Sequence, residues 1–134
     1  MNGPIPSSWS YRLLGLLRIV AAAMFLVHGT SKWFDVPAMA GMPLPVSTLP
    51  GVAGVIESVG GALMLFGFLV RPVAFVLAGE MAVAYFLQHA PHGWIPLLNK
   101  GEPAVLYCFI WLYIAAAGPG AWSIDALRMR RSRT

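Results

Sequence analysis

The sequence predicts an all-α integral membrane protein, a bundle of four transmembrane helices followed by a short C-terminal helix at the membrane interface. Hydrophobic residues make up 58% of its 134 residues and charged residues only 10%, whereas about 25% of an ordinary soluble domain is charged. The mean hydropathy of +0.72 agrees. This composition excludes a soluble globular protein, and the length fits one membrane domain.

The first predicted span covers residues 13–34, an apolar stretch long enough to cross a bilayer core. Residues 1–12 precede it as a short polar lead. A cleaved signal peptide is the competing interpretation, because Ala21-Ala22-Ala23 is similar to a cleavage region. The hydrophobicity continues beyond these alanines and no soluble domain follows, so we expect a retained helix.

The second and third spans are predicted over residues 50–70 and 72–88. Between them we expect a sharp turn at Arg71-Pro72, because proline suits the first position of a helix. The preceding segment 35–50 contains four prolines and predicts a loop outside the bilayer.

The fourth span is predicted over residues 103–118, after a second polar and aromatic loop at 89–102. The spans together form one membrane domain over residues 13–122. A basic tail follows at 123–134, in which Ser123 is placed to cap a short amphipathic helix on the membrane surface.

Positive charge predicts the orientation of the chain. The net charge is +4, and the basic residues gather at Arg12, at Arg71 and in the C-terminal tail. Because the number of spans is even, these three regions lie on the same side of the membrane. The positive-inside rule predicts that this side is the cytoplasm. We therefore expect a multi-pass protein of the bacterial cytoplasmic (inner) membrane with both termini cytoplasmic. The basic tail should lie beside anionic lipid, and no folded basic module suggests nucleic acid as a partner.

Two carboxylates, Glu57 and Glu80, lie within the second and third spans. A carboxylate in hydrocarbon costs several kcal/mol unless it faces protein, finds a partner or holds a proton. The first span brings Arg18, His28 and Lys32, whose spacing places them near one helical face. Pairing of Arg18 with either glutamate would reduce the burial cost of both charges, and a purely structural ion pair is the alternative.

The two glutamates are candidate catalytic residues for proton handling. One arginine cannot neutralise both carboxylates, so either Lys32 or His28 contributes, or one glutamate holds a proton. Small residues surround Glu57 and predict that a neighbouring helix approaches it closely. Glu80, Ala84 and Gln88 follow one another at four-residue spacing, which predicts a polar line along the third span.

The fourth span carries Tyr107 and Trp111 one helical turn apart. Such aromatic residues suit packing or a flat ligand such as a quinone. With Arg18, His28 and Lys32 they form our candidate quinone-binding set. His89 and His92 are three residues apart in the predicted loop and have no third ligand at fixed spacing, so we expect no metal site. No flavin, nucleotide or iron–sulfur motif is visible in the sequence.

Short motifs occur in a fixed order along nearly the whole chain. They are Arg12-Leu-Leu-Gly15, Gly29-x-x-Lys32, Glu57-x-x-Gly60-Gly-x-Leu63-x-x-x-Gly67-x-x-x-Arg71, Gly101-Glu102-x-Ala104, Gly118-Pro-Gly120 and Ser123-Ile-Asp125. In these motifs the chain resembles the DoxX family. The resemblance implies a compact four-helix membrane bundle in which Lys32, Glu57, Arg71 and Glu102 hold the family's polar positions. It also implies a link to redox processes, because some relatives are subunits of thiosulfate:quinone oxidoreductase and others are linked to quinone reduction or oxidative-stress complexes.

Two functional hypotheses follow. In the first, the chain is a quinone-interacting subunit of a membrane redox system, whose electron donor belongs to a partner subunit. In the second, it is a non-catalytic accessory or assembly subunit, in which buried charges set the helix register and glycine faces dock onto a larger complex. Small-solute transport has weaker support, because four short spans form a small pathway without oligomerisation. In each case we expect contact with lipid and with other membrane subunits or further copies of the chain.

Overall fold

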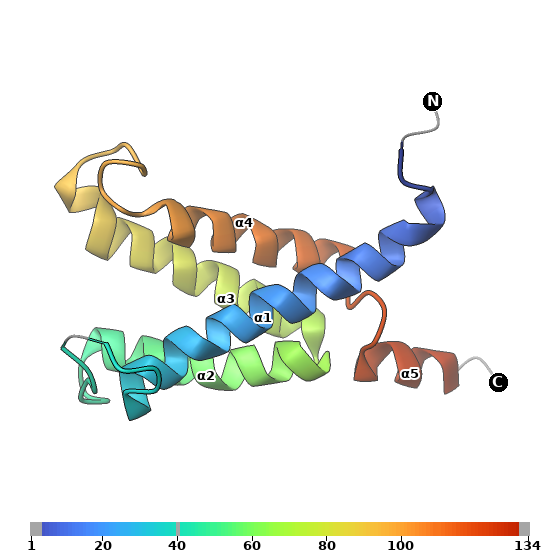
Figure 1. Ribbon diagram of the computed structural model, residues 1–134, viewed down its shortest axis with the longest axis horizontal. Helices are drawn as coiled ribbons and strands as arrows, with labels where there is room; N and C mark the ends of the chain where they lie inside the picture. Colours follow the sequence, from blue (N-terminus) through green and yellow to red (C-terminus); the bar gives the residue numbers. More distant parts are fainter. Residues whose placement is uncertain (1–3, 40, 132–134) are drawn as a thin grey trace.

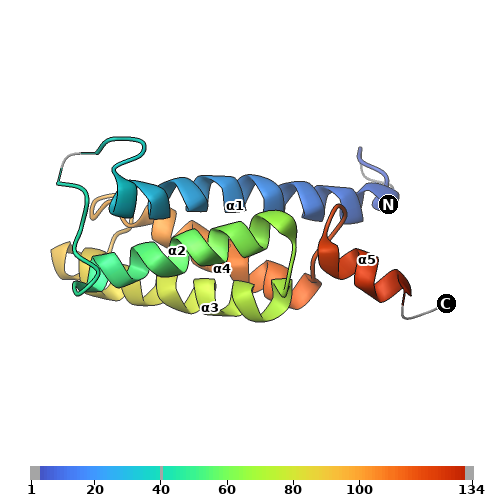
Figure 2. The ribbon, with the colours of Figure 1, turned by 90° about the horizontal axis from the view of Figure 1, so that it is seen from below.

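The computed structural model describes residues 4–39 and 41–131, and this part of the chain is helical with connecting loops and no strands. Four helices, α1 to α4, lie side by side, and α5 projects from the end of the bundle at which the chain begins (Figures 1 and 2). The helices are α1 (Ser10–Phe34), α2 (Leu49–Phe66), α3 (Val70–Ala84), α4 (Glu102–Ala117) and α5 (Ile124–Arg131). The predicted all-α fold is therefore confirmed, and so is the short C-terminal helix.

Three helical segments are long and apolar enough to cross a membrane, namely Ser7–Phe34, Leu49–Phe66 and Val70–His92. The third of these combines α3 with the short helical turns that continue it. Helix α4 is a shorter apolar helix of 16 residues. At about 1.5 Å per residue it extends about 24 Å, less than the hydrocarbon core of about 30 Å.

The predicted turn at Arg71-Pro72 is wrong, because both residues lie in the first turn of α3. Helix α2 instead ends at Gly67, whose φ of 70° is left-handed and whose neighbour Phe68 donates its N–H to the Leu63 carbonyl. A left-handed glycine at this position is the usual end of a helix. Pro72 fits the first turn of α3, where backbone N–H groups have no partner within the helix.

The core lies between two helix pairs, because α1 packs mainly on α2 and α3 packs mainly on α4. Its largest fully buried apolar side chains come from all four helices: Phe25, Met64, Leu77, Trp111 and Ile114. Large apolar side chains such as Val20, Phe75 and Leu106 point outward and are exposed. The helices are thus apolar on the faces that form the core and also on the faces that point outward, as expected for a bundle surrounded by lipid.

Helices α1 and α2 touch backbone to backbone at two glycines. A Cβ added to Gly29 would lie 2.5 Å from the backbone nitrogen of Ser58, and one added to Gly61 would lie 3.0 Å from that of Leu26. Small residues at such contacts let membrane helices approach closely. The prediction that small residues around Glu57 face a neighbouring helix is confirmed.

We expect Gly29→Ala to destabilise the protein and Gly79→Ala not to do so. The first methyl group must push α1 away from Ser58, which should lower the free energy of unfolding by about 1–3 kcal/mol. Gly79 has open space around it, so its replacement should be neutral or stabilise helix α3 by up to about 1 kcal/mol. Unfolding in mixed micelles with increasing SDS measures both values. Equal effects of the two substitutions would contradict the close contact at Gly29.

A single buried arginine fastens one end of the bundle. Arg18 of α1 is 0% exposed, and its guanidinium donates to five backbone carbonyls. Two of these belong to the last turn of α2, at Met64 and Leu65, the latter at 2.9 Å. The other three follow α4, at Pro119 (2.8 Å), Ala121 (3.1 Å) and Trp122 (2.8 Å).

The expected pairing of Arg18 with Glu57 or Glu80 is wrong. Arginine has five N–H donors, and all five are used by these carbonyls, so none remains for a carboxylate. The reason lies in the helix ends, because the last carbonyls of a helix have no intrahelical donor and must be satisfied inside a membrane. Arg18 is therefore a structural residue that joins α1, the end of α2 and the segment before α5.

We expect Arg18→Met to lower the free energy of unfolding by about 3 kcal/mol or more, since it leaves several buried carbonyls without donors. Arg18→Lys should restore only part of this loss, because an ammonium group cannot reproduce the planar fork of a guanidinium. The exposed Arg12 provides the control, and Arg12→Met should stay within about 0.5 kcal/mol of the original protein. SDS unfolding in mixed micelles compares the three variants, and similar values for Arg18→Met and Arg12→Met would refute the role of Arg18.

Candidate functional site

An ion pair joins α1 to α2 in the half of the bundle away from Arg18. The Nζ atom of Lys32 lies 2.7 Å from Oε1 of Glu57, and the two side chains are 21% and 4% exposed. Helix α2 presents Glu57 to α1 because Gly54, one turn earlier, lets the stem of Lys32 pass at close range. This is the only salt bridge among the residues that the structure describes. The pair satisfies one carboxylate oxygen of Glu57, whereas the other, the buried Oε2, has no hydrogen-bond partner among the described residues.

Glu80 of α3 lies near this pair on the wall of a groove between α2 and α3. It is within range of electrostatic interaction with both Glu57 and Lys32. Neither of its carboxylate oxygens, both buried, has a hydrogen-bond partner in the described chain. The predicted line along the third span is confirmed, because Glu80 and Ala84 of α3 and Gln88 of the helical turn that continues α3 all face the groove.

The groove has a volume of about 350 Å³, and Lys32 reaches it from α1. Its walls are otherwise mainly apolar, with Val52 and Ile56 from α2 facing Val76 and Val83 from α3. The sequence prediction missed these four wall residues. Val52 and Ile56 are four residues apart, and Val76 and Val83 lie four and three residues from Glu80, so their spacing could have placed each set on one helical face. Similar apolar spacing occurs throughout the four helices, however, and does not single out these residues.

Aromatic residues from α1 and α4 form the other side of the polar cluster. Tyr107 and Trp111 stack with their ring centroids 6.2 Å apart, and both rings contact Phe25. The ring of His28 lies edge-on to Tyr107 at 6.4 Å, although His28 itself is exposed. Tyr107 is within electrostatic range of Glu57, which connects the aromatic side to the ion pair.

Neither Tyr107 nor Trp111 lines the groove between α2 and α3. Both are buried in the core, and Tyr107 instead reaches a second groove, of about 370 Å³, between α1 and α4. The buried hydroxyl of Tyr107 and the indole N–H of Trp111 have no hydrogen-bond partner in the part of the chain that the structure describes.

The structure thus brings together six of the seven candidate residues and separates the seventh. The cluster contains His28, Lys32, Glu57, Glu80, Tyr107 and Trp111, contributed by four helices. Arg18 lies at the other end of α1 with its donors already used. His89 and His92 were predicted in a loop, but they lie in the short helical turns that continue α3, where the ring of His89 contacts the Asn99 carbonyl and that of His92 the Gln88 carbonyl.

Five buried polar atoms in this cluster have no partner within the described residues. Leaving a buried polar atom unpaired costs about 1–3 kcal/mol, and native proteins rarely gather several in one place. The arrangement combines donors, acceptors and one cation beside a groove that opens between two helices. Such a site suits a lipid-soluble ligand with polar oxygens, and its carboxyl groups can take up or release protons.

We expect Lys32→Met to lower the free energy of unfolding by about 3 kcal/mol or more, since Glu57 would lose the one hydrogen-bond partner that it has among the described residues. Adding Glu57→Gln should recover most of this loss, because the double variant has no uncompensated charge. A double-mutant cycle under SDS unfolding gives the coupling between the two sites. A coupling near zero would show that the ion pair contributes nothing to folding.

Comparisons with known proteins identify one family and two similar bacterial proteins. The DoxX family description matches residues 13–90. A Haemophilus influenzae protein described only as an uncharacterized protein is 44% identical over 117 residues, covering 84% of this chain and 87% of the relative. The inner membrane protein YqjF of Escherichia coli is 34% identical over 101 residues, covering 74% of this chain and 72% of the relative. No solved structure matches the chain significantly.

Proposed function

Because the chain belongs to the DoxX family of membrane proteins, we propose that it is a quinone-interacting subunit of a redox system in the bacterial inner membrane. One observation carries the proposal. Unpartnered carboxylate oxygens of Glu80 lie beside Lys32 on the wall of a groove between α2 and α3 that is otherwise mainly apolar. The inner-membrane location is supported by the relative YqjF, which carries that description.

The chemistry of the groove fits the two parts of a quinone. Its apolar walls suit the ring and the isoprenoid tail, and its opening between two helices admits a molecule dissolved in the membrane. The ammonium group of Lys32 is a donor without acceptor capacity, whereas a carboxyl group donates when protonated and accepts when ionised. Glu80 can therefore hold a quinone oxygen in either redox form. A bound quinone would supply two-electron, two-proton chemistry.

We propose that the residues behind the groove move protons. Glu57 pairs with Lys32 and is within electrostatic range of Tyr107, and both Glu57 and Tyr107 keep a buried polar atom without a hydrogen-bond partner among the described residues. In this proposal Glu80 exchanges a proton with the ligand, and Glu57 sets the charge around it. Tyr107 and Trp111 act as a polar back wall and do not contact the ring. Arg18 has no part in binding. Electrons come from a partner subunit that carries a redox cofactor.

We further propose that all four bundle helices cross the membrane and that both termini are cytoplasmic. The start of α1, the turn between α2 and α3, and α5 lie at one end of the bundle (Figure 2). The exposed arginines Arg12, Arg128 and Arg130 lie at this end, which supports a cytoplasmic location by the positive-inside rule. Lys32 lies near the opposite end of α1, so the quinone site would belong to the outer half of the membrane.

The accessory-subunit alternative loses one of its supports. It required the glycine faces to dock onto a partner. Gly29 and Gly61 instead mediate contact between α1 and α2, and a Cβ at Gly60 would meet Leu77 of α3 at 2.6 Å. These glycines are therefore occupied within the chain. The Lys32–Glu57 ion pair remains consistent with the accessory-subunit alternative, because it can fix the register of α1 against α2.

We expect quinone to co-purify with the protein in mild detergent and to be lost when Glu80 is replaced. Extraction and mass spectrometry measure moles of quinone per mole of chain. Glu80→Leu should reduce this ratio on the order of tenfold, because it removes a charge-assisted hydrogen bond. Glu80→Gln, which keeps a donor, should retain more quinone. Glu102→Leu is the matched control, since Glu102 is exposed and lies outside the groove between α2 and α3.

Two results would overturn the proposal. If Glu80→Leu and Glu102→Leu contain the same amount of quinone, the quinone is not bound in the groove between α2 and α3. It would then be in the detergent or on the protein surface. A constant set of partner chains without quinone in the original protein would favour the accessory-subunit alternative, and the polar cluster would then be a packing feature.

A further inference from the structure

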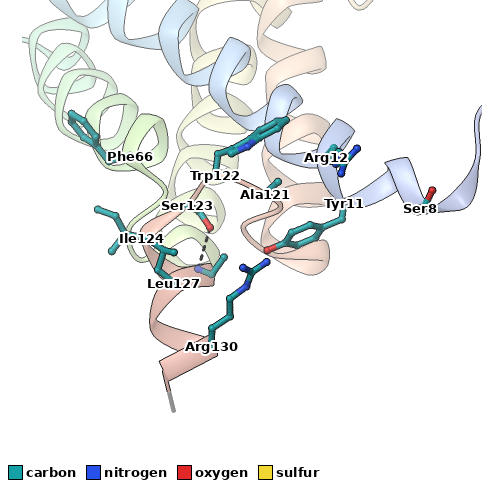
Figure 3. A pocket seen from close by; sticks show the side chains of 11 residues that line it. Ser8, Tyr11, Arg12, Phe66, Ala121, Trp122, Ser123, Ile124, Leu127 and Arg130 are labelled. Carbon is teal, nitrogen blue, oxygen red and sulfur yellow. Dashed lines mark hydrogen bonds between the residues drawn. The ribbon is translucent and has the colours of Figure 1, made fainter. Parts of the chain in front are cut away.

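A larger hollow, of about 650 Å³, lies at the end of the bundle that holds α5, far from the Lys32–Glu57 pair (Figure 3). The beginning of α1, the end of α2 and the segment that runs into α5 form its walls. Its polar side chains are Ser8, Tyr11, Arg12 and Arg130, and its large apolar ones include Phe66 and Leu127. In Figure 3 the guanidinium of Arg130 points toward the ring of Tyr11.

Backbone contacts fix the walls of this hollow. The N–H of Ala121 donates to the carbonyl of Tyr11 at 3.0 Å. A Cβ added to Gly15 would lie 2.5 Å from the carbonyl oxygen of Ala121, so the segment lies directly on α1. Ser123 caps α5 by accepting the N–H of Ala126 at 3.1 Å, as drawn in Figure 3. The hollow therefore exists before any ligand arrives.

No acidic group among the described residues forms an ion pair with the arginines on its walls. Both of these arginines, Arg12 and Arg130, are exposed. The guanidinium of Arg12 lies 5.5 Å from the ring centroid of Trp9. The nearest acidic residue in α5, Asp125, is engaged elsewhere, because its carboxylate accepts the backbone N–H groups of Leu69 and Val70.

We propose that this hollow binds the headgroup of an anionic phospholipid, with its phosphate held by Arg12 and Arg130. Guanidinium groups match the geometry of phosphate oxygens and bind them with charge-assisted hydrogen bonds. The acyl chains would follow the apolar wall at Phe66 and Leu127. Trp122 is 63% exposed beside the hollow, and tryptophan favours the headgroup region of a bilayer. The anionic surface of the cytoplasmic leaflet would favour this binding.

Native mass spectrometry of the full chain in detergent tests the site. Dioctanoyl phosphatidylglycerol is the probe, and dioctanoyl phosphatidylcholine is the zwitterionic control. We expect phosphatidylglycerol to bind with a 1:1 stoichiometry. Arg12→Gln/Arg130→Gln should raise its Kd by about 5-fold for each arginine and roughly 25-fold together. Both arginines are exposed, so the variant should keep its unfolding temperature.

Arg128→Gln/Arg131→Gln is the matched control, because it also removes two positive charges, both from α5, and neither residue lines the hollow. Its Kd should change less than about 2-fold if binding is local. Equal weakening in both double variants would overturn the proposal, because the lipid would then respond only to surface charge. Full competition by glycerol 3-phosphate would also overturn it, since the site would then bind a free phosphate. Neither outcome depends on whether the chain binds quinone.

Discussion

The five hydrogen bonds from Arg18 to backbone carbonyls determine how one end of the bundle is built. Inside a membrane, the last carbonyls of a helix cannot turn to water and must find donors in the protein. One guanidinium meets this requirement for the end of α2 and for the segment after α4 together. Because that segment leads into α5, the position of the C-terminal helix depends on a residue in α1. The hollow beside α5 is a consequence of the same constraint.

Charged residues at this end follow the helix dipoles. Arg71 donates to the carbonyls of Ala115 and Ala116 at the C-terminus of α4, and Asp125 accepts from the first N–H groups of α3. Cations thus lie at helix C-termini and an anion at an N-terminus, where each is favoured. Lys32 lies in the last turn of α1, but its ammonium group pairs with Glu57. Glu57 and Glu80 lie within α2 and α3 and do not cap a helix end.

Much of the fold could be predicted from the sequence, because composition and hydropathy determine the helical class and the approximate bounds of the helices. Local spacing also placed Glu57 against a neighbouring helix and Glu80 in line with Gln88. The partners of Arg18 could not be predicted in this way. They are backbone carbonyls 46 to 104 positions away, and every residue carries such a group. The turn at Gly67 was missed because apolar residues continue through it, so hydropathy alone did not mark the end of α2.

The Lys32, Glu57 and Glu80 side chains contain more hydrogen-bond acceptors than donors, which is unlike a purely structural ion pair. A pair that only fixes helix register is complete when each buried polar atom has a partner. Here one ammonium group faces two carboxylates, and Glu57 and Glu80 retain three buried oxygens without a donor in the described chain. Leucine or alanine at position 80 would pack in the groove without this cost. The carboxyl group of Glu80, without a hydrogen-bond partner among the described residues, therefore supports the proposal that a ligand or a proton completes this site.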